Sequence, residues 1–178
     1  MGKKVFLLAF FPLLFFGCTM QAQAPLVGLQ KEPVFSEQVF FCPEDKCAFE
    51  LIEKIDSAKE SIDIAIYSFT LDEIADSLID AKRRGVKVRV LFDAGQAQSK
   101  YSEDEHLAEN GVEVKRLDKS SGIMHNKFAV IDSVMVSTGS FNYSNNANEF
   151  NDENLVFLYG EETVEKFRQE FEELWVSS

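Results

Sequence analysis

The stretch SIDIAIYSFTLDEIADSLIDAKRRGVKVRVLFD, residues 61–93, decides the fold class of this chain. Residues 62–69 alternate apolar with small or polar side chains, which is the pattern of a β-strand. Residues 71–84 follow with apolar side chains at helical spacing, and Gly85 is a typical stop after such a helix. Residues 86–92 return to a strand pattern. A strand, a helix and a second strand in succession predict an α/β fold.

The same alternation extends to both sides of this stretch. Asp132-Ser133 is a tight-turn signal between two apolar, β-branched runs. Further strands are expected at residues 34–41, 112–117, 127–131, 134–138 and 154–159, helices at 48–59, 103–110 and 161–175, and a loop or short helix at 139–148. The pattern predicts one domain, residues 34–178, built as a mixed β-sheet sandwiched between helices.

Residues 1–17 have the composition of an export signal. Two lysines precede an apolar run at 5–16, and this run is too short to cross a bilayer as a free helix, which takes about 20 residues. Its end resembles the processing site of bacterial lipoproteins, so lipidation of Cys18 is expected; cleavage near Ala22 and a retained anchor are the alternatives. The chain is therefore expected to be exported, periplasmic or anchored by an N-terminal lipid facing away from the cytoplasm, with 18–33 as a linker.

Export also bears on the other two cysteines. Cys42 and Cys47 flank Pro-Glu-Asp-Lys, and in an oxidising compartment they can close a small disulfide loop. Two unpaired cysteines are the alternative, because spacing alone does not fix bridge geometry. A zinc site normally takes four Cys or His ligands, and with only His106 and His125 as histidines it is disfavoured.

The formal net charge of −12 becomes −14 when the two leader lysines are removed (−12 − 2). Such a charge counts against casual binding of polyanions, because attraction to phosphate dominates nucleic-acid affinity. The charges are unevenly distributed, however. Residues 82–127 hold ten Lys or Arg against seven Asp or Glu, whereas residues 128–178 hold two against ten. The acidity therefore lies mainly beyond residue 127.

The sequence MHNKFAVID, residues 124–132, carries the candidate chemistry. On a strand, the side chains that share one face are those of His125, Lys127, Ala129 and Ile131. A histidine and a lysine side by side are costly in a protein core, because an unpaired buried cation is expensive. A bound anion removes that cost, since Lys127 supplies charge to a phosphate and His125 is close enough to attack it.

A second polar stretch, TGSFN at residues 138–142, offers hydrogen-bond donors. Gly139 allows a sharp turn at a strand end, and Ser140 and Asn142 carry short polar side chains. Phosphoryl transfer requires fixed dipoles around the non-bridging oxygens, and such donors meet that requirement.

Together the two stretches read His-x-Lys, four residues, Asp, six residues, Gly-Ser-x-Asn. This pattern resembles the signature of the phospholipase D superfamily, specifically its single-motif branch of bacterial Nuc-like endonucleases. The resemblance implies an α/β fold and metal-independent hydrolysis of phosphodiesters through a phosphohistidine intermediate, with no cofactor. The residue roles it implies are nucleophile for His125, phosphate ligand for Lys127 and Asn142, supporting donor for Ser140, and orienting carboxylate for Glu153.

Two further residues are weighed against this signature. Asp132 completes the written motif and so belongs to the catalytic set by resemblance. On a strand it lies on the face opposite His125, however, which favours a structural role in bonding the adjacent turn. His106, on the polar side of a short helix, is expected to be a surface residue.

One His-x-Lys motif implies two chains. The chemistry needs a neutral imidazole to attack phosphorus and a protonated one to supply the leaving oxygen with a proton. A two-fold homodimer that brings His125 of each subunit to the axis provides both.

The expected substrate is DNA or RNA, cleaved as a non-specific endonuclease. Basic residues that favour it are Lys82, Arg83, Arg84, Lys87, Lys115, Arg116 and Lys119. A phospholipid head-group diester is the alternative substrate, favoured by membrane tethering and overall acidity. A catalytically inactive polyanion-binding protein is the third hypothesis, although the motif is intact.

Overall fold

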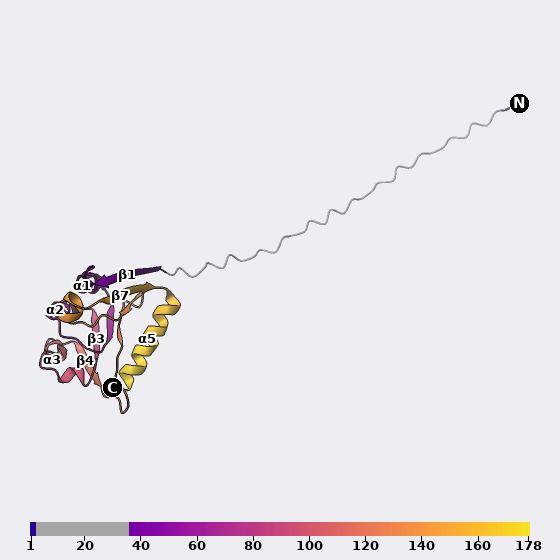
Figure 1. The fold of residues 1–178 in the computed structure, drawn as a ribbon. Helices are drawn as coiled ribbons and strands as arrows, with labels where there is room; N and C mark the ends of the chain where they lie inside the picture. The colour runs from indigo at the N-terminus through magenta and orange to yellow at the C-terminus, as the bar shows by residue number, and fades with distance from the viewer. Residues whose placement is uncertain (3–35) are drawn as a thin grey trace. The chain divides into compact units, whose positions relative to one another are not determined.

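The computed structural model describes residues 1–2 and 36–178. The expected export signal, Cys18 and the linker to residue 33 lie outside the described residues. Within the described part, no helix is long and apolar enough to cross a membrane. The folded unit described below runs from β1 to the C-terminus (Figure 1).

Seven strands form one mixed sheet in the order β1-β7-β6-β5-β2-β3-β4. The strands are β1 (Ser36–Cys42), β2 (Ser61–Ile66), β3 (Lys87–Asp93), β4 (Glu113–Leu117), β5 (Lys127–Ile131), β6 (Met135–Gly139) and β7 (Glu153–Tyr159). The pairs β2–β3 and β3–β4 are parallel, and the other four pairs are antiparallel. The predicted α/β fold with a mixed sheet is confirmed.

Helices cover both faces of this sheet. The helices are α1 (Cys47–Ser57), α2 (Asp72–Arg83), α3 (Asp104–Glu109), α4 (Asn145–Glu149) and α5 (Glu161–Val176), with a 3-10 turn η1 (Gln96–Gln98). One apolar core joins α1 and α2 to side chains such as Ile64 and Val90, and a second joins α5 to their sheet neighbours Ala65 and Leu91. Each central strand therefore buries both of its faces, which explains its nearly continuous apolar sequence.

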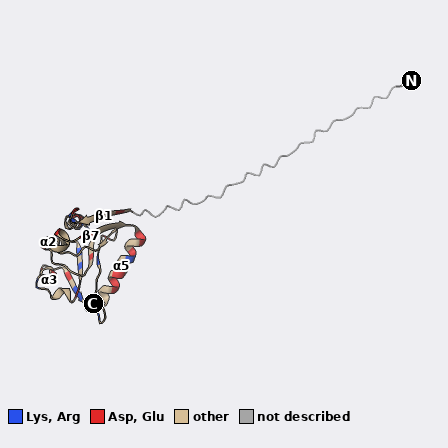
Figure 2. Ribbon diagram, viewed as in Figure 1, with Lys and Arg blue, Asp and Glu red and all other residues tan. Residues whose placement is uncertain are grey.

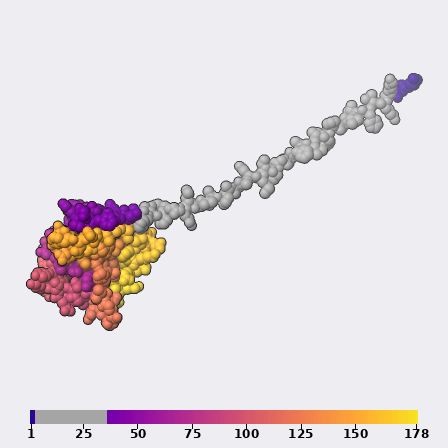
Figure 3. All heavy atoms as spheres, in the orientation of Figure 1, coloured from indigo at the N-terminus to yellow at the C-terminus, as the bar shows by residue number. Residues whose placement is uncertain are grey.

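The N-terminal strand closes one edge of the sheet. β1 pairs with β7 from Ser36↔Tyr159 to Cys42↔Glu153, so the first described strand lies along the last strand in the chain (Figure 3). Cys42, the last residue of β1, forms a disulfide with Cys47, the first residue of α1. This is the pairing that the sequence predicted, and it fixes the turn between the two elements.

Most expected elements are found with small shifts at their ends, but the strand predicted at 62–69 is shorter. β2 ends at Ile66. Beyond it, the backbone N–H of Tyr67 donates to the carbonyl of Asn126 at 2.9 Å, and that of Thr70 donates to the carbonyl of Tyr143 at 2.7 Å. The first bond continues the β2–β5 register by one residue, and the second ties the chain to the loop that follows β6.

Candidate active site

The predicted site residues gather at one end of the sheet. In the β2–β5 pairing, Ile66 at the end of β2 lies opposite Lys127 at the start of β5. In the β6–β7 pairing, Gly139 at the end of β6 lies opposite Leu155, two residues after Glu153. Because neighbouring antiparallel strands begin and end at the same edge, segments far apart in sequence meet here.

The His-x-Lys pair lies at the start of β5. His125 precedes the strand and is exposed, whereas Lys127 is its first residue and is partly buried. The Lys127 ammonium donates to the carbonyl oxygen of His125 at 3.0 Å, and its Nζ lies 3.3 Å from Nδ1 and 3.4 Å from Nε2 of the imidazole. The cation and the candidate nucleophile are thus adjacent, as the sequence predicted, although only Lys127 belongs to the strand.

Burial affects the ammonium group of Lys127. Desolvation lowers the pKa of Lys127 below its ordinary value of 10.5, and the negative charge of Glu153 works in the opposite direction. A partly desolvated cation held near one carboxylate is well placed to gain from a bound phosphate, which adds negative charge where solvent is already excluded.

Two residues without an assigned role in the sequence also belong to this site. The ring of Tyr67 lies 4.5 Å from the His125 imidazole, centroid to centroid, and the Lys127 ammonium lies 5.2 Å from the Tyr67 centroid. The Tyr67 hydroxyl accepts a hydrogen bond from the side-chain amide of Gln96 at 3.1 Å. Tyr67 directly follows β2, which is the strand that pairs with β5. This position is the one feature of the sequence that could have indicated a role for Tyr67 in the site.

Ser140 and Glu153 form a second cluster. The Ser140 hydroxyl donates to Oε2 of Glu153 and accepts from the backbone N–H of Asn154 at 3.1 Å. Oε1 of Glu153 accepts from the side chain of Asn151 at 3.2 Å. In the described single chain, neither carboxylate oxygen bonds the His125 ring, so the orienting role expected for Glu153 stays a prediction. The Ser140 hydroxyl therefore donates its hydrogen bond to Glu153 and is not free to donate to a substrate.

Gly139 permits this cluster. Its φ is +147°, and a Cβ built there would lie 2.2 Å from the carbonyl oxygen of Asn154. No side chain fits in that space, so the β6 end and the β7 start approach closely only because residue 139 is glycine.

Asn142 follows in the same loop. Its amide oxygen is buried and has no hydrogen-bond partner among the described residues. Buried polar groups are normally paired, and this oxygen is an exception in the loop that also carries Ser140.

Asp132 does not join the site. It lies one residue beyond the far end of β5, and its carboxylate accepts backbone hydrogen bonds of 2.7–3.1 Å from Lys59, Glu60 and Ser61. Burial acts to raise the pKa of Asp132, but these hydrogen bonds outweigh it and the pKa lies below the ordinary value of 3.8. These contacts are those of the structural role that strand parity favoured for Asp132.

The remaining predicted candidates lie elsewhere. His106 sits on α3 with its side chain about half exposed, 3.7 Å from an Asp76 oxygen. Within residues 36–178, no group of three or more His, Cys, Asp or Glu side chains is arranged to hold a metal ion.

The basic residues divide between the two ends of the sheet. Lys82, Arg83, Arg84 and Lys87 lie where α2 ends and β3 begins, which is the end opposite the site. The Lys115 ammonium bonds the Trp175 carbonyl of α5 at 2.6 Å. Arg116 and Lys119 are left at the catalytic end, while acidic side chains gather on α5 (Figure 2).

Comparison with known proteins places this geometry in a family. The family model described as "Cardiolipin synthase, PLD-like domain" matches residues 51–175. A mitochondrial cardiolipin hydrolase of Chlamydomonas reinhardtii is 33% identical over 124 residues, which are 70% of this chain and 55% of that protein. The chain thus spans only about half the length of this curated relative.

Two solved structures are covered almost completely. Nuc from Salmonella typhimurium, a phospholipase D family member, matches with a TM-score of 0.76 and 33% identity over 81% of this chain and 96% of that chain. NucT from Helicobacter pylori matches with a TM-score of 0.76 and 34% identity over 81% of this chain and 98% of that chain. The resemblance stated from the motif is confirmed: the chain belongs to the phospholipase D superfamily and carries a PLD-like domain.

Proposed function

We propose that this protein hydrolyses nucleic acid as a metal-independent, non-specific endonuclease that uses His125 as its nucleophile. The observation that carries the proposal is the contact between His125 and the Lys127 ammonium at the exposed end of the sheet. A protein cation beside an imidazole provides both the attacking nitrogen and the charge that a phosphodiester needs.

The proposed reaction has two steps. In the first, a ring nitrogen of His125 forms a bond to phosphorus and the bond to one ester oxygen breaks, so that oxygen leaves with the bonding electrons and takes a proton. In the second, water attacks the phosphohistidine, the P–N bond breaks, and the proton of the water returns to a base. In this proposal Lys127 and Asn142 bind the non-bridging oxygens in both steps.

A second imidazole is needed as the acid of the first step. His106 lies on α3, 3.7 Å from an Asp76 oxygen, and is not part of the cluster. The proposal therefore includes a homodimer in which His125 of a second copy serves as this acid.

Mixed dimers test the shared site. Wild-type chains are unfolded and refolded with an excess of His125→Ala chains, and turnover per wild-type chain is measured. A site that needs both imidazoles loses turnover per wild-type chain as mixed dimers form. Constant turnover per wild-type chain, or full activity in a monodisperse monomer, contradicts the proposal. The matched control is dilution with His106→Ala chains, which should remain active.

Metal independence is tested separately. Cleavage of plasmid and of single-stranded DNA should be unchanged by EDTA, because the protein supplies the cations around phosphate. Activity abolished by EDTA and restored by magnesium contradicts the mechanism. Tight DNA binding without any turnover would favour the inactive polyanion-binding protein.

A phospholipid head-group diester is the second candidate substrate. It is favoured by the likeness to a protein named as a mitochondrial cardiolipin hydrolase. Parallel assays on DNA, RNA and vesicles that contain phosphatidylcholine or cardiolipin separate the candidates, because the ratio of kcat/KM values measures specificity directly.

We also propose that the protein acts outside the cytoplasm. The disulfide between Cys42 and Cys47 is the feature of the folded unit that favours this, since structural disulfides persist in oxidising compartments. Lipidation at Cys18 is tested by metabolic labelling with palmitate, compared with a Cys18→Ala variant. Labelling that persists in the variant, or a cytoplasmic location, contradicts this part of the proposal.

A further inference from the structure

Four residues lie in one row across the catalytic end of the sheet. Lys127 lies opposite Ile66, Ile66 lies beside Phe92, and Phe92 lies beside Arg116. Residues in register on neighbouring strands project from the same face. Lys127 and Arg116 thus leave the same face at the same end, separated by three strand spacings, or about 14 Å.

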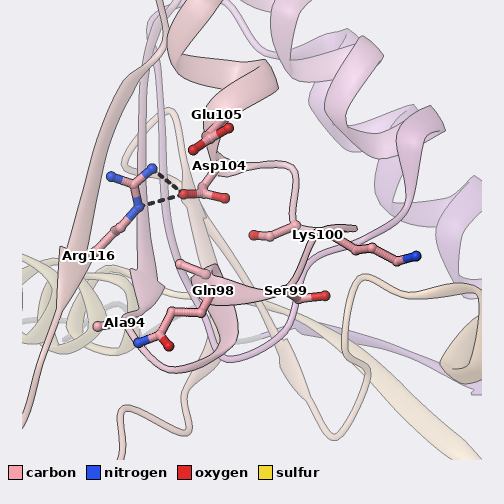
Figure 4. Close-up of a pocket in the computed structure, with 9 residues that line it drawn as sticks. Ala94, Gln98, Ser99, Lys100, Asp104, Glu105 and Arg116 are labelled. Atoms are coloured by element: carbon pink, nitrogen blue, oxygen red, sulfur yellow. Dashed lines mark hydrogen bonds and ion pairs between the residues drawn. The ribbon is translucent and has the colours of Figure 1, made fainter.

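Arg116 lines a cavity of about 480 Å³ at the ends of β3 and β4. The wall opposite β4 is formed by η1 and the turn after it, including Gln98, Ser99 and Lys100. Figure 4 shows these polar side chains around the opening, with Arg116 next to the start of α3. The ends of parallel strands are a frequent place for ligand binding in α/β sheets.

The Arg116 guanidinium is held in place by the carboxylate of Asp104. Its Nε donates to Oδ2 of Asp104 at 2.5 Å, Nη2 contacts the same oxygen, and the Asp104 carboxylate is buried. The Arg116 side chain itself is 48% exposed, and Nη1 has no protein partner among residues 36–178. An arginine fixed by a buried carboxylate, with donors still available, loses little freedom when it binds an anion.

A second polar group in the cavity is unsatisfied. The Ser102 hydroxyl is buried and has no hydrogen-bond partner among the described residues. The cavity and the catalytic cluster share a wall, because Gln96, which donates to the Tyr67 hydroxyl, is the first residue of η1. A chain bound at His125 would cross Tyr67 and η1 to reach the cavity.

We propose that this cavity is a subsite for a nucleotide a few positions along the strand from the cleaved phosphodiester, with its backbone phosphate at Arg116. The proposal rests on the proposed function and narrows it to polymeric substrates. A separation of about 14 Å corresponds to roughly four nucleotides at the stacked rise of 3.4 Å, and to fewer in a stretched strand. A phospholipid head group is too small to reach from Lys127 to Arg116.

Glu105 and Tyr101 should affect nucleotide binding in opposite directions. Glu105 lines the same cavity and carries the charge that opposes phosphate. Tyr101, which lies in the chain between the lining residues Lys100 and Ser102, is 67% exposed, and its ring can stack with a base. Removing the charge of Glu105 should therefore strengthen binding, whereas removing the ring of Tyr101 should weaken it.

The test compares Arg116→Gln with Arg83→Gln. Arg83 is also an exposed arginine paired to an aspartate, Asp80, but at the opposite end of the sheet. Arg116→Gln should raise KM for single-stranded oligonucleotides roughly ten-fold through loss of one charged hydrogen bond, and reduce the salt slope of log KM by about 0.7. Hydrolysis of bis-p-nitrophenyl phosphate should not change, and Arg83→Gln should behave as wild type throughout.

The dependence of KM on oligonucleotide length is a second measurement, which a partial loss of folded protein does not change. In the wild type, KM should fall as the oligonucleotide lengthens until it reaches Arg116, and this dependence should disappear in Arg116→Gln. If Arg116→Gln does not fold, Glu105→Gln and Tyr101→Ala decide the question. Glu105→Gln should lower KM for oligonucleotides and Tyr101→Ala should raise it.

Several results would overturn the subsite. One is that Arg116→Gln folds and keeps the wild-type KM and its dependence on oligonucleotide length. Another is that Arg116→Gln loses as much activity on bis-p-nitrophenyl phosphate as on oligonucleotides. A third is that KM for oligonucleotides changes in neither Glu105→Gln nor Tyr101→Ala. In each case wild-type cleavage of oligonucleotides leaves the proposed function intact. Cleavage of phospholipid vesicles with no cleavage of any oligonucleotide overturns both proposals.

Discussion

The Lys127 ammonium is bonded to the carbonyl oxygen of His125 at 3.0 Å while its side chain is drawn partly out of water. The ammonium group loses part of its hydration in this position, which costs free energy. Binding of an anion offsets that cost. The folded protein without substrate should therefore gain little from this charge, and catalysis should gain a great deal.

Replacing Lys127 separates these two effects. Lys127→Met should lower turnover by roughly 10²- to 10³-fold, the usual loss when a charge-stabilising group is removed. The melting temperature should stay the same or rise, because a desolvated cation is replaced by an apolar chain of similar length. Thermal unfolding and turnover of a small diester are measured together. Substantial retained turnover would remove Lys127 from the site.

Gly139 predicts a steric effect. Gly139→Ala places a Cβ 2.2 Å from the Asn154 carbonyl oxygen, so the ends of β6 and β7 must separate and shift Ser140 relative to Glu153. Gly111→Ala is the matched control, because its φ is also positive (+82°) but its Cβ meets nothing within 4 Å.

The control should cost only the left-handed backbone penalty of about 1–2 kcal/mol. Gly139→Ala should lower the free energy of unfolding by more than this and should also reduce turnover, as measured by denaturant titration and a diester assay. Equal losses in the two variants would show that the close approach to Asn154 is not important.

Much of this arrangement could be predicted from the sequence, for reasons that particular residues make clear. The helix at residues 71–84 was evident because its apolar positions repeat at a helical period and pack on the sheet as α2. The roles of His125, Lys127 and Glu153 were predicted by resemblance to a long motif; the structure places His125 beside Lys127, and Glu153 bonds Ser140 and Asn151.

Other features depend on pairing between segments that sequence spacing does not reveal. β2 ends at Ile66, and the residues beyond it pair with a distant loop, because the Tyr143 N–H donates to the Ser68 carbonyl and the Thr70 N–H donates to the Tyr143 carbonyl. Likewise, Arg116 looked the same as Arg83 in the sequence. Only the register of β4 places Arg116 at the catalytic end, while Arg83 lies at the other.

Asp132 predicts a stability effect with a defined pH dependence. Its folded-state pKa is depressed, so it contributes stability that is present above its ordinary pKa of 3.8 and is lost as pH falls through the folded value. Asp132→Asn keeps the shape and tolerates the left-handed backbone (φ +52°). It should lower the free energy of unfolding by about 1–3 kcal/mol at neutral pH.

The difference between wild type and Asp132→Asn should shrink in acid, as followed by denaturant titration from pH 7 to pH 3. Turnover of the small diester at neutral pH should stay near the wild-type value. Loss of turnover without loss of stability would return Asp132 to the catalytic set.

The disulfide predicts a stability effect at the edge of the sheet. Cys42 and Cys47 are five residues apart, and a loop this short restricts the unfolded chain by about 2 kcal/mol in the chain-entropy description. The Cys42→Ser, Cys47→Ser double variant should unfold at lower denaturant by that amount. Adding dithiothreitol should destabilise the wild type and leave the double variant unchanged; equal sensitivity to dithiothreitol contradicts the prediction.

The covalent step is the central claim, and trapping it is the most direct test. The wild type is mixed with an oligonucleotide labelled at the cleaved phosphate, quenched during turnover at alkaline pH to preserve a phosphoramidate, digested, and mapped by mass spectrometry. We expect the labelled phosphate on the ring of His125, and no adduct in His125→Ala. A label on any other residue, or none while turnover proceeds, would contradict the account.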